Sequence, residues 1–295
     1  MRKNIDKHVF NCVGYFIILF FVFFCILPYI LVISGSFTDE SSIYQHGYNL
    51  FPKVFSLDAY KTIFTFPDDI IRSYLVTISL TATGTLLGLI LTSMTSYVLQ
   101  RQTFKSRNFF SLFFFFTTLF SGGLVSYYIL ISRYLNIKET YWALLLPPLF
   151  TVFDIIVVRT FMKSIPSSLA ESGTIDGANE FTIFLKIYLF LSKPALATIG
   201  LFIALRYWND WYNALLFVNH TKNLYPLQFT LYKMLTGADA MRRLQATAGM
   251  SLAFKFPSES YKLAMTIVAT GPIIFLYPFL QKYFIKGLTI GAVKG

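Results

Sequence analysis

Charged residues are scarce in this chain. Asp, Glu, Lys and Arg make up only 13% of its 295 residues, about half of the roughly 25% that an ordinary soluble domain carries. The apolar share is 55%, the aromatic share is 19% and the mean hydropathy is +0.59. This composition excludes a soluble enzyme, a disordered segment and a nucleic-acid-binding module as first interpretations. It indicates an integral membrane protein.

Cysteine and histidine are also rare. The two cysteines, Cys12 and Cys25, both lie in the first apolar run, so no disulfide framework is expected. The three histidines are scattered and lack the spacing of metal ligands. The phosphate-binding pattern G-x-x-x-x-G-K-[ST] is absent, because Gly-Lys never occurs. We therefore predict no catalytic residue, no metal and no cofactor on this chain, which is not itself an ATPase.

Six stretches are apolar and long enough for a bilayer-crossing helix of about 20 residues. The first has an apolar core of about 25 residues, too long for a cleaved signal peptide, whose core is about 7–15 residues. The net charge of +11 is explained by Lys and Arg accumulating on cytoplasmic flanks. With both termini in the cytoplasm, that side holds 13 of the 25 basic residues and 4 of the 14 acidic residues. The predicted spans are at about 9–33, 73–99, 108–131, 140–161, 194–218 and 263–284.

These patterns predict an all-α integral membrane protein with six transmembrane helices and both termini cytoplasmic. Residues 1–295 are expected to form a single transmembrane domain in a bacterial cell membrane, the inner membrane where there are two. Two shorter patterns fall within the spans. The G-x-x-x-G of Gly84 and Gly88 predicts close packing against another helix. Ser121-Gly122-Gly123 predicts an irregularity or a packing site in the third span.

Residues 162–193, between the fourth and fifth predicted helices, form the most informative connection. Ser168 and Glu171 have the spacing of a capping box, which starts a short helix. Asp176-Gly177 predicts a turn, and Asn179 predicts the cap of a second helix. The prediction is a helix–turn–helix on the cytoplasmic membrane face. By these local signals alone, an ordinary amphipathic connector fits equally well.

The spacing of Glu171, Gly177, Ile187 and Leu189 resembles the EAA loop of ABC-importer permeases. Ser172 and Gly173 stand where that family has two alanines, and Phe190 stands where it usually has proline, which leaves the sharpness of the following bend open. Other resemblances extend over nearly the whole chain. The tail, residues 281–295, resembles the C-terminus of maltose-type (MalG-like) sugar permeases. Residues 120–123 and 140–144 resemble the polysaccharide- and oligosaccharide-uptake branch of that group, and residues 208–211 resemble the start of its recurrent motif in helix five.

The resemblance implies a permease subunit of an ATP-driven sugar importer, which forms half of the pathway for an oligosaccharide. It implies four kinds of partner: a second, non-identical permease, a dimeric cytosolic ATPase that holds ATP and Mg, an extracytoplasmic sugar-binding protein, and membrane lipid. No nucleic acid is expected. In this family the EAA loop inserts a coupling helix into a groove on the ATPase. Carried over, the coupling residues are Ser168, Glu171, Ser172, Gly173, Asp176, Gly177 and Ala178.

Charged residues within spans are candidates for the translocation pathway. Arg206 and Asp210 are four residues apart on the fifth predicted helix, so they are expected either to pair or to line the pathway. Asp154, in the fourth predicted helix, is expected to be either a hydrogen-bond partner between helices or a pathway residue. Sugars present hydroxyls and apolar ring faces, which polar groups interleaved with aromatic rings can bind. The pathway candidates are Asp154, Arg206, Trp208, Asp210, Trp211 and Asn213.

Two other classes of protein fit an apolar chain of this length. A stand-alone ion-coupled secondary transporter usually has internal repeats and broken helices at matched positions, and no repeat is visible in the sequence. A membrane-embedded transferase acting on lipid-linked substrates would need clustered acids or histidines at a membrane face. The acids here are dispersed, with Asp68-Asp69 an adjacent pair on the predicted external side. The importer permease is the interpretation that the residues favour.

Overall fold

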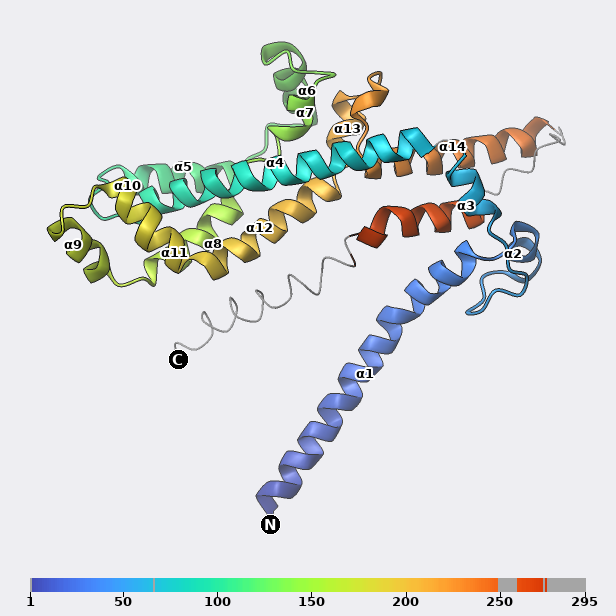
Figure 1. The fold of residues 1–295 in the computed structure, drawn as a ribbon, viewed down its shortest axis with the longest axis horizontal. Helices are drawn as coiled ribbons and strands as arrows, with labels where there is room; N and C mark the ends of the chain where they lie inside the picture. The colour runs from blue at the N-terminus through green and yellow to red at the C-terminus, as the bar shows by residue number, and fades with distance from the viewer. Residues whose placement is uncertain (1, 66, 249–258, 273, 275–295) are drawn as a thin grey trace. The chain divides into compact units, whose positions relative to one another are not determined.

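The computed structural model describes residues 2–65, 67–248, 259–272 and 274 (Figure 1). Over these residues the regular structure is helical, and one isolated β-bridge joins Thr38 to Phe55. The all-α prediction is therefore confirmed. The chain divides into two compact units, residues 1–67 with 231–272 and residues 68–230 with 273–295, and each is described by itself.

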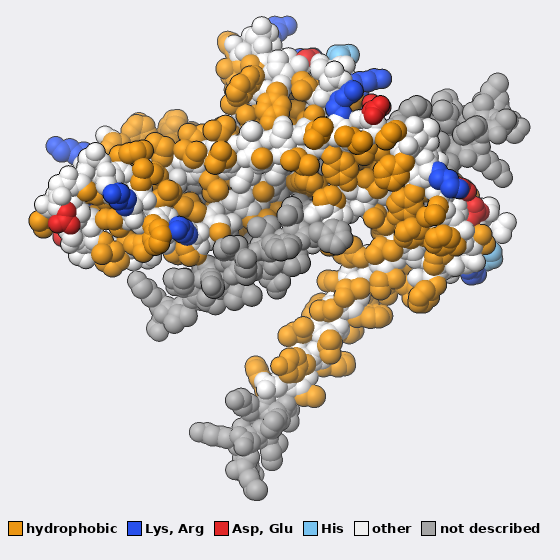
Figure 2. All heavy atoms as spheres, in the orientation of Figure 1, with side chains coloured by type: hydrophobic (Ala, Val, Ile, Leu, Met, Phe, Trp, Pro, Cys, Tyr) orange, Lys and Arg blue, Asp and Glu red, His pale blue; other side chains and the backbone are white. Residues whose placement is uncertain are grey.

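The first unit contains the long helix α1 (Arg2–Ser36). Its apolar part, Phe10–Ser36, is 27 residues long, enough to cross a bilayer. Hydrophobic side chains cover it on the visible face (Figure 2), and its most apolar stretch buries none of its residues within the chain. An apolar helix with no protein around it is stable only against lipid or another protein. The first predicted span thus corresponds to a helix of sufficient length.

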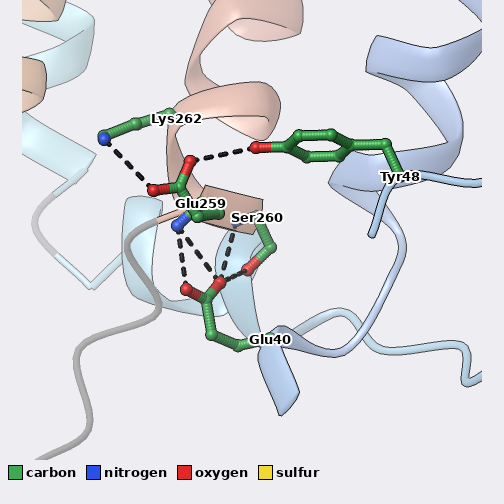
Figure 3. A network of polar contacts seen from close by, with 5 residues as sticks. All are labelled: Glu40, Tyr48, Glu259, Ser260 and Lys262. Carbon is green, nitrogen blue, oxygen red and sulfur yellow. Dashed lines mark hydrogen bonds and ion pairs between the residues drawn. The ribbon is translucent and has the colours of Figure 1, made fainter. Parts of the chain in front are cut away.

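Polar contacts hold the start of the described helix 259–272 in the first unit (Figure 3). Glu40, in the short helix α2 (Glu40–His46), accepts hydrogen bonds from the backbone N–H groups of Glu259 and Ser260, both at 2.9 Å. The Glu259 carboxylate accepts a hydrogen bond from the Tyr48 hydroxyl at 3.0 Å. Burial, reinforced by the Glu259 carboxylate, raises the pKa of Tyr48 to about 12. A carboxylate at a helix N-terminus satisfies N–H groups that have no partner within the helix.

The second unit is built around α4 (Pro67–Gln100), a 34-residue helix that includes the second predicted span. The helix α14 (Leu227–Ala248) starts in this unit. Its first N–H, at Leu227, donates to the Thr77 hydroxyl at 2.8 Å. The remaining helices of the unit are α5 (Arg107–Leu119), α6 (Gly123–Ile129), η1 (Leu130–Tyr134), α7 (Tyr141–Leu145), α8 (Val152–Lys163), α9 (Ser167–Ile175), α10 (Glu180–Ile183), η2 (Phe184–Tyr188), α11 (Leu189–Leu191), α12 (Lys193–Trp208), α13 (Tyr212–Phe217) and η3 (Lys222–Leu224).

The G-x-x-x-G of α4 packs against α12, which confirms the predicted close approach. A Cβ atom at Gly84 would clash with the ring of Tyr207. A Cβ at Gly88 would lie 3.2 Å from the Ile203 Cδ1 atom and 3.2 Å from the backbone oxygen of Leu149. Tyr207 is buried, and its hydroxyl donates to the backbone oxygen of Leu145 at 2.6 Å. The two glycines thus make room for a large side chain between α4 and α12.

Three predicted spans are not continuous helices, which corrects the sequence-based prediction. The segment 108–131 is broken between α5 and α6. The chain bends by 114° between α5 and the helix formed by α6 and η1, and Gly123, the first residue after the break, has φ +78°. Ser121-Gly122-Gly123 is therefore the irregularity that the sequence predicts. The segment 140–161 is interrupted at 146–151, where Pro147 and Pro148 lack the N–H groups that a helix needs. The segment 194–218 is interrupted between Trp208 and Tyr212.

Among the residues that the structure describes, two helices are long and apolar enough to cross a membrane, and up to four spans result if each bent pair counts as one. The described helix 259–272 contains the start of the sixth predicted span. The rest of that span, and the C-terminal tail 281–295 that resembles sugar permeases, lie outside the described residues apart from residue 274.

Candidate coupling loop and polar pathway

The helices α9 and α10 form the predicted helix–turn–helix, which lies at one end of the second unit (Figure 1). The turn depends on Gly177, whose φ of +80° a residue with a side chain rarely adopts. The N–H of Ala178 donates to the oxygen of Gly173 at 2.9 Å, and the N–H of Gly177 to that of Thr174 at 3.0 Å. This pair of bonds is a Schellman motif, which satisfies the last carbonyl groups of a helix.

The two predicted helix caps have different outcomes. Asn179 caps α10 as predicted, because its side chain accepts a hydrogen bond from the N–H of Thr182 at 2.8 Å. The prediction of a capping box at Ser168 and Glu171 is wrong. The helix α9 begins at Ser167, its N-cap residue is Pro166, and no side chain caps it. Ser168 therefore lies inside the first turn, where its hydroxyl cannot accept the bond that an N-cap residue accepts.

The helix α9 has a buried side and an exposed side. Ala170 is 1% exposed. A Cβ at Gly173 would lie 3.3 Å from the Ile187 Cδ1 atom, so the glycine that replaces an alanine of the EAA pattern allows α9 to approach η2 closely. Glu171, Ser172 and Asp176 are exposed. These three side chains are available to a partner.

Sequence reasoning missed Ile175, at the end of α9. Its side chain is 86% exposed, although a large aliphatic residue loses about 1.5–3 kcal/mol when it remains in water instead of being buried. Leu169 of the same helix is 42% exposed, so α9 presents apolar as well as polar side chains. The signal in the sequence was its position directly before the turn residues Asp176-Gly177.

A cluster of polar side chains attaches the start of α10 to the end of α4. The Arg101 guanidinium forms an ion pair with the Glu180 carboxylate at 2.5 Å. The Tyr97 hydroxyl donates a short hydrogen bond to the same carboxylate. Sequence reasoning missed all three residues, because 79 or more positions separate Glu180 from its partners. These contacts join two segments that are distant in the chain.

The chain bends by 81° between the segment Glu180–Leu191 and α12. In the EAA pattern a proline usually stands at the position of Phe190, and the bend forms without it. Ser192, with φ −85° and ψ 4°, ends α11, and Pro194 occupies the first turn of α12, where a missing N–H costs nothing. The Lys193 ammonium lies 3.8 Å from the centre of the Phe190 ring. The departure from the family pattern therefore leaves the bend intact.

The charged residues of the predicted fourth and fifth spans pair differently from the prediction. Arg206 forms an ion pair with Asp154 at 2.9 Å and donates to the backbone oxygen of Pro148 at 3.1 Å. The predicted i,i+4 pair of Arg206 with Asp210 is wrong, because α12 ends at Trp208 and Asp210 lies beyond it. Asp154 is 1% exposed. Its predicted role as a polar partner between helices is confirmed.

Asp210 belongs to a second polar cluster. It accepts hydrogen bonds from the backbone N–H of Asn213 at 3.1 Å and from the Asn213 side chain at 2.7 Å. The Tyr127 hydroxyl of α6, which sequence reasoning missed, donates to the Asn213 Oδ1 atom at 2.7 Å. Trp211, which follows Asp210 in the chain, is 39% exposed, whereas Trp208 is 5% exposed. Of the six pathway candidates, the structure thus joins Asp210 with Asn213 and Asp154 with Arg206.

A carboxylate outside the predicted spans holds another loop. Glu139 accepts hydrogen bonds from three consecutive backbone N–H groups, those of Asn219 at 3.1 Å, His220 at 3.2 Å and Thr221 at 3.0 Å. Burial alone would raise the pKa of the Glu139 carboxyl, but the three backbone donors outweigh it, and the pKa is lowered from 4.5. The charged form of Glu139 is therefore favoured by the folded loop.

Replacing Glu139 with glutamine is expected to lower the free energy of unfolding by about 1 kcal/mol at pH 7, because the three N–H groups lose a charged acceptor. A lowered pKa contributes stability above the unfolded-state pKa of about 4.3. The difference in the free energy of unfolding between the wild type and Glu139→Gln should therefore shrink as the pH falls below about 4.5 and through the folded-state pKa of Glu139. Thermal unfolding in detergent between pH 7 and pH 3.5 measures it. A difference that stays constant over this range would contradict the role of the charge.

The comparisons with known proteins agree with this geometry. No family model matches the chain. It is 41% identical over 271 residues to protein LplC of Bacillus subtilis, covering 92% of this chain and 90% of that one. It is 38% identical to the polygalacturonan/rhamnogalacturonan transport system permease protein YtcP of the same organism, covering 98% and 99%. A solved bacterial ABC transporter involved in the import of the acidic polysaccharide alginate has a chain with TM-score 0.80 and 26% identity, covering 95% of this chain and 98% of that one.

These likenesses extend over nearly the full length of each chain. The fold and the loop define an ABC-transporter permease, an integral protein of the bacterial cell membrane. Within that class, the chain belongs to the family of sugar-importer permeases.

Proposed function

We propose that this chain forms half of the translocation pathway of an ATP-driven importer for an oligosaccharide. An extracytoplasmic binding protein delivers the sugar, and a second, non-identical permease forms the other half of the pathway. The observation that carries the proposal is the capped α9–turn–α10 loop, on which the side chains of Glu171, Ser172 and Asp176 are exposed within the described part of the chain. Relatives named as permeases for polygalacturonan/rhamnogalacturonan and for arabinooligosaccharides support a saccharide substrate. Asp154 neutralises Arg206, so this pair sets no preference for an acidic sugar.

The proposed topology has six spans, with both termini and α9 on the cytoplasmic side, and the whole chain works as one transmembrane domain. The bent pair α5 and α6 then belongs to the third span, α7 and α8 to the fourth, and α12 and α13 to the fifth. The excess of basic residues on the cytoplasmic side supports this orientation. Breaks within spans are tolerated where protein or a water-filled cavity surrounds the exposed backbone.

In the proposed mechanism α9 inserts into a groove on a dimeric cytosolic ATPase, which holds ATP and Mg. Glu171, Ser172 and Asp176 supply polar contacts, and Ile175 supplies apolar area. When the ATPase dimer closes, α9 moves, and the contacts of Glu180 with Tyr97 and Arg101 pass the movement to α4. The paired permeases then open outward to receive the sugar, and hydrolysis returns them to the inward-open state.

The proposal predicts the composition of the complex. A tag on this chain, gentle extraction from native membranes and mass spectrometry should recover two copies of one ATPase and one different permease. A chain that purifies alone, folded and active in transport, would refute the importer and favour a stand-alone transporter. In the variant Ile175→Asp, recovery of the ATPase should fall by roughly tenfold or more, because the contact loses a buried aliphatic side chain. Recovery of the second permease should stay unchanged. Lys105→Gln, an exposed change on a neighbouring loop, is the matched control.

A further inference from the structure

A basic cavity of about 1090 Å³ lies beside α9 in the second unit. It is lined by the end of α4 and the loop after it, the start of α5, the end of α8, the length of α9, and one residue each of α10 and η2. The α9 residues include Glu171 and Ile175, which also belong to the proposed contact with the ATPase. Its charged lining residues are four basic and two acidic: Arg101, Arg107, Arg159 and Lys163, with Glu171 and Glu180.

The positive charge of this cavity is only partly neutralised. Glu180 is held by Arg101 at 2.5 Å, so these two charges cancel. None of the ion pairs within the described residues includes Arg107, Arg159 or Lys163. Glu171 is the one remaining acid of the lining. The cavity therefore has an excess of two positive charges.

Three buried donors in this lining have no acceptor. The Gln100 Nε2, Arg101 Nε and Arg159 Nε atoms are buried, and within the described part of the chain none of them has a hydrogen-bond partner. A buried donor without an acceptor costs about 1–3 kcal/mol, so such a group is ordinarily satisfied in the working protein. These three atoms have almost no accessible surface, so an anion in the cavity does not reach them directly. The Arg107 and Arg159 side chains as a whole are partly exposed, and the arginine guanidinium is suited to phosphate oxygens.

An apolar surface adjoins the cavity. The helix α5 begins at the cavity residue Arg107 and buries none of its own residues within the described chain. Phe109 and Leu112 are each 68% exposed, and Phe113 is 53% exposed. A basic cavity at one end of an apolar helix matches an anionic amphiphile, whose head group enters the cavity while its acyl chains lie along the helix.

We propose that the cavity binds the phosphate head group of an anionic phospholipid from the cytoplasmic leaflet, with the acyl chains along α5. The C-terminal tail of the same chain is an unsuitable occupant by charge, because residues 281–295 contain three lysines and no acidic residue. The assignment of the lipid to the cytoplasmic leaflet rests on the topology given under the proposed function, whereas the retention of the lipid can be measured without transport.

The test is native mass spectrometry of the tagged complex in detergent, with defined lipid added. Phosphatidylglycerol should be retained over phosphatidylcholine, because both carry a phosphate but only the first has a net negative charge. Each cavity charge removed should lower retention roughly fivefold. The variants Arg159→Gln and Arg107→Gln should each show this loss, and Arg159→Lys should show less of it, since the charge is kept. Lys105→Gln is the matched control, because Lys105 is on the same loop but does not line the cavity.

Several results would overturn the proposal. One is equal retention of the two lipids by the wild-type complex, and another is wild-type retention by both glutamine variants. Displacement of phosphatidylglycerol by inorganic phosphate at an equal concentration would assign the site to free phosphate. A crosslink from the cavity to an acidic segment of the ATPase would assign it to that protein. Recovery of the ATPase with each variant shows that the variant is folded, so loss of lipid with intact partners separates this proposal from the proposed function.

Discussion

The variant Arg206→Gln is expected to lower the free energy of unfolding by about 3 kcal/mol. Asp154 is 1% exposed, and its ion pair with Arg206 at 2.9 Å is the interaction that neutralises its charge. Removing one partner of a buried ion pair costs about 3–5 kcal/mol because it leaves the other charge buried and uncompensated. Arg206 also donates to the Pro148 oxygen, so the interruption between α7 and α8 loses a contact with α12.

A double-mutant cycle separates the pair from the packing around it. The combination of Asp154→Asn with Arg206→Gln leaves no unpaired charge, so it should be at least about 1 kcal/mol more stable than the sum of the single variants predicts. Thermal unfolding of the purified complex in detergent measures each member of the cycle. Arg133→Gln is the control, because Arg133 is exposed and its loss should change stability by less than about 0.5 kcal/mol. Additive losses would show that the pair has no coupling.

The variant Gly177→Val is expected to lower ATP-dependent sugar uptake by roughly 5–30-fold. Gly177 has φ +80°, and a residue with a Cβ in the left-handed region costs about 1–2 kcal/mol. That strain favours conformations in which the Schellman motif is broken and α9 is turned away from its partner. Uptake into vesicles and the ATPase rate, both normalised to the amount of complex, measure the loss.

The variant Gly177→Asn is the matched control for this experiment. Asparagine adds a side chain but tolerates the left-handed conformation better than other residues do, so uptake should stay within about twofold of the wild type. If both variants lose uptake equally, the loss comes from the surface that the side chain covers and not from backbone strain. If neither loses uptake, the turn does not limit coupling.

The sequence alone determined those parts of the protein that depend on local chemistry. The composition required a membrane environment, because so few charged residues cannot cover a soluble surface. Asn179 and Gly177 predicted the cap and the turn of the coupling loop, since each acts on backbone groups within six residues. The G-x-x-x-G of α4 predicted close packing because small residues permit it in any helix. The expected family and function followed from several resemblances together, those of the EAA-like loop, the tail 281–295 and the segments 120–123, 140–144 and 208–211.

Tertiary structure decided the rest, for physical reasons that a local pattern does not contain. Whether a long apolar segment is one helix or two depends on what receives its unpaired backbone groups, and three predicted spans are broken. A buried charge pairs with the opposite charge that the fold places beside it, so Arg206 meets Asp154, 52 positions away, and not Asp210 on its own segment. The same holds for Glu180 with Arg101 and for the basic cavity next to α9. Local signals act through the neighbouring backbone, whereas pairing and cavities arise where segments distant in the chain meet.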